Sequence, residues 1–506
     1  MGAAHAGVHV GRVPEPHVVN AAIALGIVAA VVAGTMLFGL RGVRGVVMDP
    51  QEYIVGGRRM GALLLWLLLA GEIYTTFTFL GAAGWAYGKG APAYYILAYG
   101  TVAYVISFFL APPIHRIARE RGMLTGPDFF SDRYGSRRLG ALVAVLGFLM
   151  LVPYVTLQLT GLQILLQIAG YGAINPFAAV AIGFFVVAIF TFVTGLRGAA
   201  FASIVKDALV LVGVLFAGLA LPAHFFGSPA GALDAVLRDH PNWLTIAGPT
   251  APNGITWVVT TTILTACGFF MWPQSMAAIY SARDEDTLRR NAIFLPFYQV
   301  MLLLVFFAGF TALEVLPGLK DAAADQSFML VVQKYYPAWV LGGVAAAGTL
   351  AALIPAAAQL LAAASIVGKN VFADYGLVRD AAGETRTTRI LVLVVALLAF
   401  AFWALARTTL VGLLLIGYNG ITQLFPGVVL GVMTRRPPAV AVGAGIVAGL
   451  IVLVYFAATQ QGQVAGINTG LVALAVNAAV LGGVAAVARS AWLGARRDEG
   501  PSTSSG

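Results

Sequence analysis

Residues 71–81 read GEIYTTFTFLG, which places one carboxyl group and three threonine hydroxyls between two glycines in the middle of an apolar run. Polar side chains and irregular backbone at membrane depth require a cavity lined by protein or water, because lipid cannot hydrogen-bond to them. A second apolar run, residues 260–274, reads TTTILTACGFFMWPQ, in which Pro273 removes a backbone donor and Gly268 loosens the turn before it. We interpret both runs as membrane helices broken near their middle, although glycine and proline also occur where helices merely pack or kink.

The composition of the whole chain indicates a membrane setting. Of 506 residues, 60% are hydrophobic and 10% are charged, against about 25% charged residues in an ordinary soluble domain. A membrane span needs about 20 apolar residues, so the apolar runs predict an all-α polytopic membrane protein. About thirteen spans are expected from these runs, at residues 18–40, 60–85, 93–112, 139–168, 175–194, 198–222, 257–279, 291–315, 336–366, 389–405, 408–432, 437–458 and 467–489.

The basic residues predict the orientation of the chain. If the N-terminus is outside, most of the 30 Lys and Arg residues fall in short loops on the inner side, Arg58, Arg133 and Arg290 among them. By the positive-inside rule we expect a multi-pass protein of the cell (plasma) membrane with its N-terminus outside and its C-terminus cytoplasmic. The net charge of +9 then reflects topology. We therefore expect the lipid bilayer as a partner, and neither nucleic acid nor an obligatory protein partner.

The two broken spans are each the first in a set of five, spans 2–6 and spans 7–11. Because five is odd, the two sets have opposite topology, as in inverted-repeat transporters. Half-helix N-termini at the breaks would offer N–H groups to an anion, and the freed carbonyls would face a cation. The chain then divides into an N-terminal segment with the first span and an inner loop (1–59), a first inverted repeat (60–222), an outer loop (223–256), a second inverted repeat (257–432), spans 12 and 13 (433–489) and a disordered cytoplasmic tail (490–506).

Several motifs resemble the sodium/solute symporter family, over roughly Asp49 to Arg436. Residues 52–59 (EYIVGGRR) resemble the motif that precedes the second helix of the family. Residues 194–198 (TGLRG), with Asp207 downstream, resemble the signature around its sixth helix.

Within that family the chain is most similar to bacterial monocarboxylate permeases of the lactate, pyruvate and alanine type. This similarity lies in residues 70–81 and in residues 84–90, which read GWAYGKG. The resemblance implies a secondary active transporter, a symporter, with a LeuT-type 5+5 inverted-repeat core. It also implies a substrate site between helices 2, 3, 4, 7 and 11.

The resemblance further implies a sodium site, from which this sequence departs. The carbonyls of the family's site fall near Gly71 and Tyr74, and its hydroxyl pair falls on the residues around Pro355 and Ala356. Residues 350–364 contain no hydroxyl at all. Because sodium is a hard cation that favours a shell of oxygens, we expect the site to be degraded and predict no metal site.

Lys206 is the only cation inside a predicted span. We hypothesise that its ammonium occupies the vacated cation site and couples transport to protons, since desolvation brings a buried lysine toward titration near neutrality. The alternatives are that Lys206 snorkels to the interface or is paired permanently with an acid, that sodium remains the coupling ion, and that transport is facilitated diffusion.

Two acids are further coupling candidates. Glu72 could carry a proton, bind a cation or cap free N–H groups of the half-helix. Asp207 follows Lys206 directly, so on a helix it points about 100° away from it. We therefore expect Asp207 to serve the cytoplasmic exit or to pair with an inner-loop arginine, and not to pair with Lys206.

A small carboxylate needs hydrogen-bond donors, and no arginine lies in the interior of any predicted span. Recognition must then rest on helix-end N–H groups, on polar side chains, or on Lys206 as a counter-ion. The candidate substrate-binding residues are Thr75, Thr76, Thr78, Tyr154, Gln158, Trp272, Gln274, Tyr418, Asn419 and Gln423.

Other classes of function fit less well. A channel would show rings of like charge or a repeated filter loop, and a membrane enzyme would show a cluster of histidines, cysteines or acids in the spans. The six histidines fall outside the predicted spans, and Cys267 is the single cysteine, so we expect no enzyme, no cofactor and no disulfide. The sequence favours uptake of lactate or pyruvate with H⁺ as coupling ion. The alternative is a sodium-coupled symporter for an amino acid or another organic anion.

Overall fold

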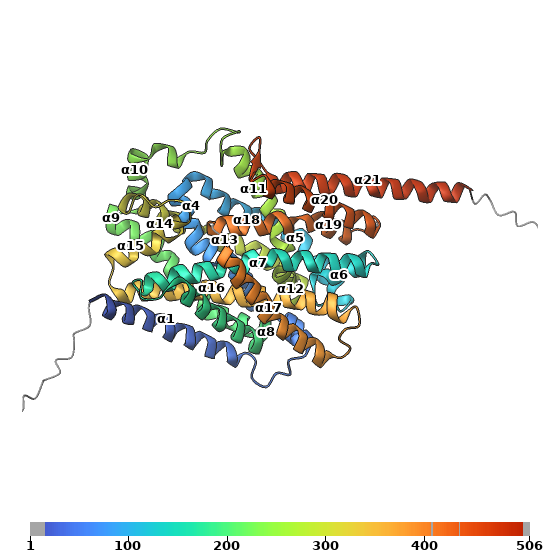
Figure 1. Cartoon of the computed structure of the whole chain (residues 1–506), viewed down its shortest axis with the longest axis horizontal. Coiled ribbons are helices and arrows are strands. Elements are labelled where there is room, and N and C mark those ends of the chain that lie inside the picture. Colours follow the sequence, from blue (N-terminus) through green and yellow to red (C-terminus); the bar gives the residue numbers. More distant parts are fainter. Residues whose placement is uncertain (1–15, 406–407, 435, 499–506) are drawn as a thin grey trace, which may run out of the picture.

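The computed structural model describes residues 16–405, 408–434 and 436–498 of the chain. Almost all of the described chain is helical, with one two-stranded hairpin between the last two helices. Figure 1 shows the helices packed side by side, with the end of the last helix projecting from the body.

The N-terminal half comprises α1 (Pro16–Arg41), α2 (Pro50–Val55), η1 (Gly56–Arg58), α3 (Ala62–Ile73), η2 (Phe77–Gly81), α4 (Ala82–Lys89), η3 (Ala91–Tyr94), α5 (Tyr95–Glu120), α6 (Gly126–Arg133), α7 (Arg137–Ala169), α8 (Pro176–Leu215), η4 (Phe216–Ala220), α9 (Leu221–Phe226), α10 (Pro229–Asp239) and η5 (Pro241–Leu244).

The C-terminal half begins with the second broken helix and ends with the projecting one. Its elements are α11 (Ile255–Gly268), η6 (Phe269–Met271), α12 (Pro273–Ser281), α13 (Glu285–Val300), α14 (Leu302–Val315), η7 (Asp321–Gln326), α15 (Ser327–Tyr335), α16 (Ala338–Val367), η8 (Gly368–Ala373), α17 (Ala381–Leu405), α18 (Leu410–Ile421), η9 (Thr422–Leu424), α19 (Phe425–Val432), α20 (Ala439–Ala458), β1 (Gln463–Val464), β2 (Ile467–Asn468) and α21 (Thr469–Asp498).

Both of the predicted breaks are present. The helix pair that contains α3 and α4 bends by 48° and the pair that contains α11 and α12 bends by 53°. At the first break Tyr74 leaves helical geometry, with φ −93° and ψ 83°. At the second, Trp272 is extended, with φ −62° and ψ 138°, because the ring of Pro273 disfavours the helical conformation in the residue before it.

The described residues contain ten helices long and apolar enough to cross a membrane, and twelve spans if each bent pair counts as one. One of the ten, Pro176–Phe226, has 51 residues, far more than a bilayer needs. Gly195 interrupts it with φ 57° and ψ −157°, and a Cβ at this position would collide with Tyr53. Dividing the segment at Gly195 gives the thirteen spans that the sequence predicts.

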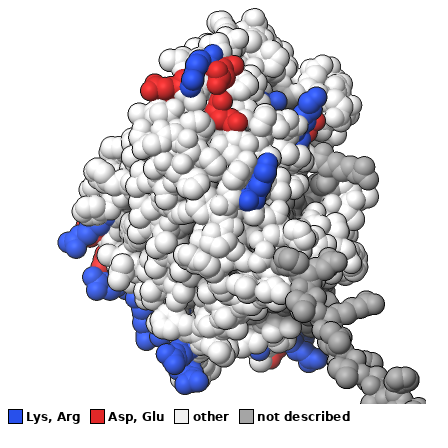
Figure 2. Space-filling view, turned by 90° about the vertical axis from the view of Figure 1, so that its left-hand side faces the viewer, with Lys and Arg blue, Asp and Glu red and all other residues white. Residues whose placement is uncertain are grey.

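Helix α16 lies at the centre of the molecule. The helices α1, α7, α8 and α17 pack around it, and 94% of its most apolar stretch is buried. Its sequence, AWVLGGVAAAGTLAALIPAAAQLLAAASIV, is dominated by alanine and glycine, whose small side chains let neighbouring helices approach closely. Outside the core, many large apolar side chains are exposed, and Figure 2 shows charged side chains gathered at the top and along the lower edge of a largely uncharged face.

Two details differ from the sequence prediction. The hairpin of β1 and β2 joins α20 to α21 in a protein predicted to be all-α. The predicted tail, 490–506, begins as a continuation of α21, which runs to Asp498, because the alanines, leucine and arginines there are good helix formers. Residues 499–506 lie outside the described part of the chain.

A candidate cation and substrate site at the helix breaks

The first break is capped by its own threonines. Thr78 Oγ1 accepts a hydrogen bond from the N–H of Thr75 (3.0 Å) and donates to the carbonyl of Ile73 (2.8 Å). Thr75 Oγ1 accepts from the N–H of Phe77 (3.2 Å). The hydroxyls of Thr75 and Thr78, predicted to bind substrate, thus satisfy backbone groups that the break releases from the helix ladder.

Thr76 turns the other way, toward α7. Its hydroxyl donates to Oε1 of Gln158 over 2.7 Å, and both side chains are fully buried. Nε2 of Gln158 has no hydrogen-bond partner among the described residues. A buried amide N–H is costly to leave unpaired, so Gln158 presents a donor to whatever enters this site.

A hydrogen bond joins the two breaks. Nε2 of Gln274, in the first turn of α12, donates to Oε2 of Glu72 at the end of α3 over 3.1 Å. Both side chains are buried, and Oε1 of Gln274 has no partner in the described part of the chain. The structure therefore brings together the two segments that the sequence analysis identified as discontinuous.

Aromatic rings pack against one another beside the second break. The ring of Trp272 lies 4.9 Å from that of Tyr154 and 5.4 Å from that of Tyr418, measured between centroids. Tyr99 of α5, which sequence reasoning missed, adds a ring 5.8 Å from Tyr418. Nε1 of Trp272 has no partner among the described residues. Three of the predicted residues are thus neighbours, with an unsatisfied donor among them.

Asn419 and Gln423 face away from the breaks. Nε2 of Gln423 donates to the carbonyl of Gly470 (3.4 Å), and its Oε1 accepts from Asn477 of α21 (3.1 Å). A Cβ on Gly470 would collide with the amide of Asn419. The two residues are one helical turn apart on the face of α18 and η9 that packs on α21, whereas Tyr418 lies about 100° around the helix. The structure thus separates them from the other substrate candidates.

Lys206 is completely buried. It pairs with Asp207, contrary to the expectation from helix geometry. Nζ of Lys206 lies 2.7 Å from Oδ1 of Asp207, whose side chain is 5% exposed. The prediction that these neighbours would not pair was wrong, because the four-carbon stem of lysine can reach around the helix even though the two Cβ atoms point apart. Without water, an ammonium and a carboxylate lower their desolvation cost by approaching each other.

Lys206 also lies against the first break. A Cβ on Gly71 would sit 2.8 Å from Nζ of Lys206 and 3.9 Å from Oγ of Ser203. Only glycine leaves room for the ammonium to contact the backbone of the broken helix. The cationic group therefore lies at one of the two positions, Gly71 and Tyr74, where the family resemblance places the carbonyl ligands of a cation.

At the positions where the family resemblance places a hydroxyl pair, α16 has none, although it carries Thr349 and Ser365 on either side of them. Pro355 and Ala356 are buried in α16, which packs on α8 and α3. Their side chains contain no oxygen. Sequence reasoning missed Gln359, one turn further on, which is fully buried with neither side-chain atom hydrogen-bonded to a described residue. It is the only polar side chain among residues 350–364, a signal that was present in the sequence.

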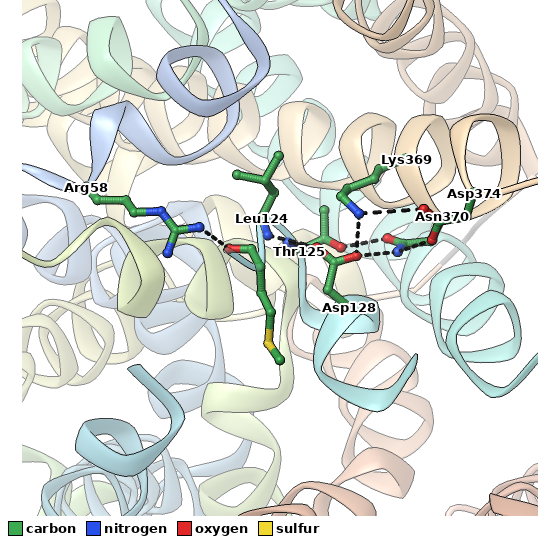
Figure 3. Close-up of polar contacts among 8 residues, drawn as sticks. Arg58, Leu124, Thr125, Asp128, Lys369, Asn370 and Asp374 are labelled. Atoms are coloured by element: carbon green, nitrogen blue, oxygen red, sulfur yellow. Dashed lines mark hydrogen bonds and ion pairs between the residues drawn. The ribbon is translucent and has the colours of Figure 1, made fainter. Parts of the chain in front are cut away.

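A second polar cluster, also missed, joins α6 to η8, which follows α16 (Figure 3). Asp128 Oδ1 accepts from Nζ of Lys369 (2.8 Å) and from Nδ2 of Asn370 (2.6 Å). Asp128 Oδ2 accepts from the N–H groups of Leu124 (2.8 Å) and Thr125 (3.0 Å). The cluster ties the loop between spans 3 and 4 to η8, which lies more than 200 residues away in sequence.

Arg58 fixes the same region from the other side. Its guanidinium donates to the carbonyls of Ala118 (3.2 Å) and Met123 (2.5 Å), at the end of α5 and in the loop before α6. Burial lowers the pKa of Arg58, and the neighbouring Arg119 adds to this effect. Figure 3 shows Arg58 on the side of Leu124 and Thr125 opposite Lys369.

The protein has many membrane helices, and a hydrogen bond joins the breaks of the two broken ones. This arrangement is typical of a secondary transporter. A model of the sodium:solute symporter family matches residues 53–458. The chain belongs to this family.

Two relatives cover most of the chain. An uncharacterized symporter of Bacillus subtilis, YhjB, is 37% identical over 479 residues, which are 92% of this chain and 98% of the relative. A monocarboxylate transport permease protein of Rhizobium johnstonii is 30% identical over 448 residues, 85% of this chain and 89% of the relative. These relatives are transporters and not enzymes.

Solved structures show the same fold. A Na⁺-coupled sialic acid symporter in a substrate-bound outward-open state matches with a TM-score of 0.74 and 16% identity, over 93% of this chain and 98% of that one. The nucleobase-cation symporter Mhp1 matches with a TM-score of 0.53 and 13% identity, over 87% and 95%. The chain therefore has the LeuT-type architecture that the sequence predicts.

Proposed function

We propose that this protein is a proton-coupled symporter that takes up small monocarboxylates such as lactate or pyruvate. In this proposal Lys206 replaces the sodium ion of its family. One observation carries it: the buried ammonium of Lys206 fills the position that a Cβ on Gly71 of the broken helix would take. A fixed cation at that position supplies the positive charge that a bound sodium ion supplies in sodium-coupled members of the family.

The chemistry of the pair suggests how a proton could be moved. Lys206 and Asp207 are buried together, so protonation of one alters the charge that the other faces. Glu72, at the same break, provides a second buried carboxyl group in contact with Gln274 of the other repeat. A proton taken up by one of these groups would change the net charge of the site. The outward-facing and inward-facing states of the transporter could then differ in that charge.

The substrate class rests on size and on donors. Gln158 and Trp272 each present an unpaired N–H group, and the rings of Tyr154 and Tyr418 limit the volume beside them. A small carboxylate can accept both hydrogen bonds, and Lys206 supplies a counter-charge. The named monocarboxylate permease among the relatives supports this class.

Transport into proteoliposomes tests the proposal. We expect labelled lactate or pyruvate to exchange in counterflow, and to accumulate when the lumen is more alkaline than the medium in sodium-free buffer. Unlabelled monocarboxylates should compete, and proline or pantothenate should not. Accumulation driven by inward sodium at fixed pH, with no response to a pH gradient, would contradict proton coupling.

Sodium coupling is the second candidate, and a specific observation favours it. Glu72, Asp207 and Gln359 place buried side-chain oxygens on helices α3, α8 and α16, and hard cations bind such oxygens. In that case Lys206 would be an internal partner of Asp207 only. The same proteoliposome experiment separates the two candidates, because the two gradients are imposed independently.

A further inference from the structure

Gly195 divides α8 into a first arm, residues 176–194, and a second arm, residues 196–215. A cavity of about 600 Å³ lies between the loop that follows α1, the first arm of α8 and the start of α17. Its lining includes Val47, Asp49, Phe192, Thr385, Arg386 and Arg389. It lies at the end of the molecule where the sequence predicts the cytoplasmic loops. It is separate from the helix breaks and plays no part in the proposed coupling mechanism.

The polar groups of this cavity lack partners. Thr385 is 9% exposed, and its hydroxyl has no hydrogen bond to any described residue. Arg386 is exposed and makes no ion pair with a described residue. Nε of Arg389 is buried and also unpaired within the described chain. Three residues from the first turns of α17 that carry donors thus line one cavity, where the helix N-terminus also favours an anion.

Arg389 is held in place by aromatic rings. Its guanidinium carbon lies 5.3 Å from the centroid of Tyr53 and 5.5 Å from that of Phe192. Contacts with ring faces do not use the N–H groups of a guanidinium, and these groups bind phosphate oxygens in pairs. The one acid in the lining, Asp49, already accepts a hydrogen bond from the N–H of Glu52 at the start of α2 (2.8 Å). The cavity therefore has a net positive charge.

The apolar surroundings indicate what kind of anion fits. The first arm of α8 runs beside α17: Phe192 meets Arg389 at one end, and Phe177 meets Phe400 at the other, with ring centroids 5.3 Å apart. Exposed apolar side chains lead away from the cavity along both helices, spaced three or four residues apart. They are Phe185, Ile189 and Phe192 on α8 and Ile390, Leu393 and Leu397 on α17.

We propose that this cavity binds the phosphate group of an anionic phospholipid. Arg386 and Arg389 contact the phosphate oxygens, and Thr385 donates a hydrogen bond to them. The acyl chains lie along the apolar stripes of α8 and α17. A basic pocket between membrane helices on the side of the basic loops has the chemistry that recognises such headgroups.

Occupancy of the site would reach the helix that carries Lys206. Tyr53, on which Arg389 stacks, donates a hydrogen bond from its hydroxyl to the carbonyl of Thr191 (2.9 Å), one turn before the reversal at Gly195. A lipid bound to Arg389 therefore braces the point where α8 turns back. We expect lipid binding to raise the thermal stability of the protein.

Lipid titration of the purified full-length protein in detergent tests the proposal. Phosphatidylglycerol and phosphatidylcholine with identical acyl chains, and inorganic phosphate alone, are compared by native mass spectrometry and by the thermal unfolding midpoint. We expect phosphatidylglycerol to bind more tightly than phosphatidylcholine and to raise the midpoint, and inorganic phosphate to have little effect. Equal binding of the two lipids, or equal protection by inorganic phosphate, would overturn the assignment.

Variants locate the site. Arg386→Gln and Thr385→Val are expected to weaken phosphatidylglycerol binding, by about tenfold for the arginine, the loss of one charge-assisted contact. Arg379→Gln is the matched control, because Arg379 is exposed just before the start of α17 and does not line the cavity. Arg386 is exposed, so its variant should fold normally, which its unfolding midpoint without lipid checks. Equal affinities of Arg386→Gln and Arg379→Gln would contradict the proposal.

Discussion

Lys206 and Asp207 show why a charged side chain buried in this protein needs a partner of opposite charge. Their side chains are 0% and 5% exposed, and each ion buried alone would cost several kcal/mol. Pairing over 2.7 Å removes part of that cost, so replacing one partner leaves the other charge uncompensated. The double variant Lys206→Gln/Asp207→Asn neutralises both and is the cleaner probe of function.

Gly71 should be intolerant of even one methyl group. Alanine there would place its Cβ 2.8 Å from Nζ of Lys206, so the ammonium must leave the broken helix. We predict that Gly71→Ala reduces lactate or pyruvate uptake at least about tenfold, a change of about 1.4 kcal/mol, and leaves expression intact. Gly343→Ala is the matched control, since nothing lies within 4 Å of its added Cβ. Unchanged uptake by Gly71→Ala would mean that the contact with Lys206 is dispensable.

Asp325, in η7 outside the spans, should make stability depend on pH. Burial raises its pKa from 3.8 to about 7, although the N–H of Leu410 donates to its carboxyl group over 2.8 Å. A raised pKa means that the folded protein holds the proton more tightly than the unfolded chain does. The contribution of Asp325 to stability is therefore present below about pH 4 and is lost as the pH rises through about 7.

The variant Asp325→Asn should remove this dependence. Asparagine keeps an acceptor for Leu410 and cannot ionise. We expect the thermal unfolding midpoint of the wild type to fall between pH 5 and pH 8, and that of the variant to fall less. Parallel pH profiles for the two proteins would show that Asp325 is not the group responsible.

At the scale of elements, the loop helix α6 is fixed by its contact with η8. Asp128 joins Lys369 and Asn370 to the backbone at the start of α6, and its pair with Lys369 is mostly buried. We predict that Asp128→Asn lowers the free energy of unfolding by about 2–3 kcal/mol. Chemical or thermal unfolding in one detergent measures the difference.

The same helix supplies the control for that prediction. Asp132 pairs with Arg121 over 3.4 Å, with side-chain exposures of 31% and 57%. Because solvent screens such a pair, Asp132→Asn should cost at most about 1 kcal/mol. Equal losses in the two variants would show that the buried cluster contributes no more than a surface ion pair.

The elements that sequence reasoning predicted well are those set by local backbone chemistry. Pro273 excludes a helical Trp272, and the glycines and threonines around Tyr74 supply a break together with its caps. The reversal at Gly195 lies in the short gap between two predicted spans. Such features depend on residues a few positions apart, which a single sequence shows directly.

The contacts that sequence reasoning missed depend on side-chain reach or on distant partners. Lys206 bends around its helix to Asp207, a pairing that the directions of the Cβ atoms argue against. Gln423 meets Asn477 only because α21 packs on that face of η9. Asp128 and Lys369 are 241 residues apart, and neither lies in a recognisable motif.

For the whole molecule, alternating access requires that the two repeats move relative to each other around a shared site. The hydrogen bond between Glu72 and Gln274 crosses from one broken span to the other at that site. Lys206 lies on the second arm of α8, against the first broken span. A change in the protonation of these groups would therefore act where the two repeats meet, which is the physical basis of the coupling that we propose.

The most direct test of Lys206 as the built-in cation is accumulation of labelled pyruvate or lactate in proteoliposomes without sodium. With an alkaline lumen, the wild type should accumulate substrate above equilibrium. The double variant Lys206→Gln/Asp207→Asn should not accumulate substrate, and its counterflow should need a higher substrate concentration because the counter-charge of Lys206 is lost. Proton-driven accumulation by the double variant equal to that of the wild type, or wild-type accumulation that requires sodium, would contradict the account.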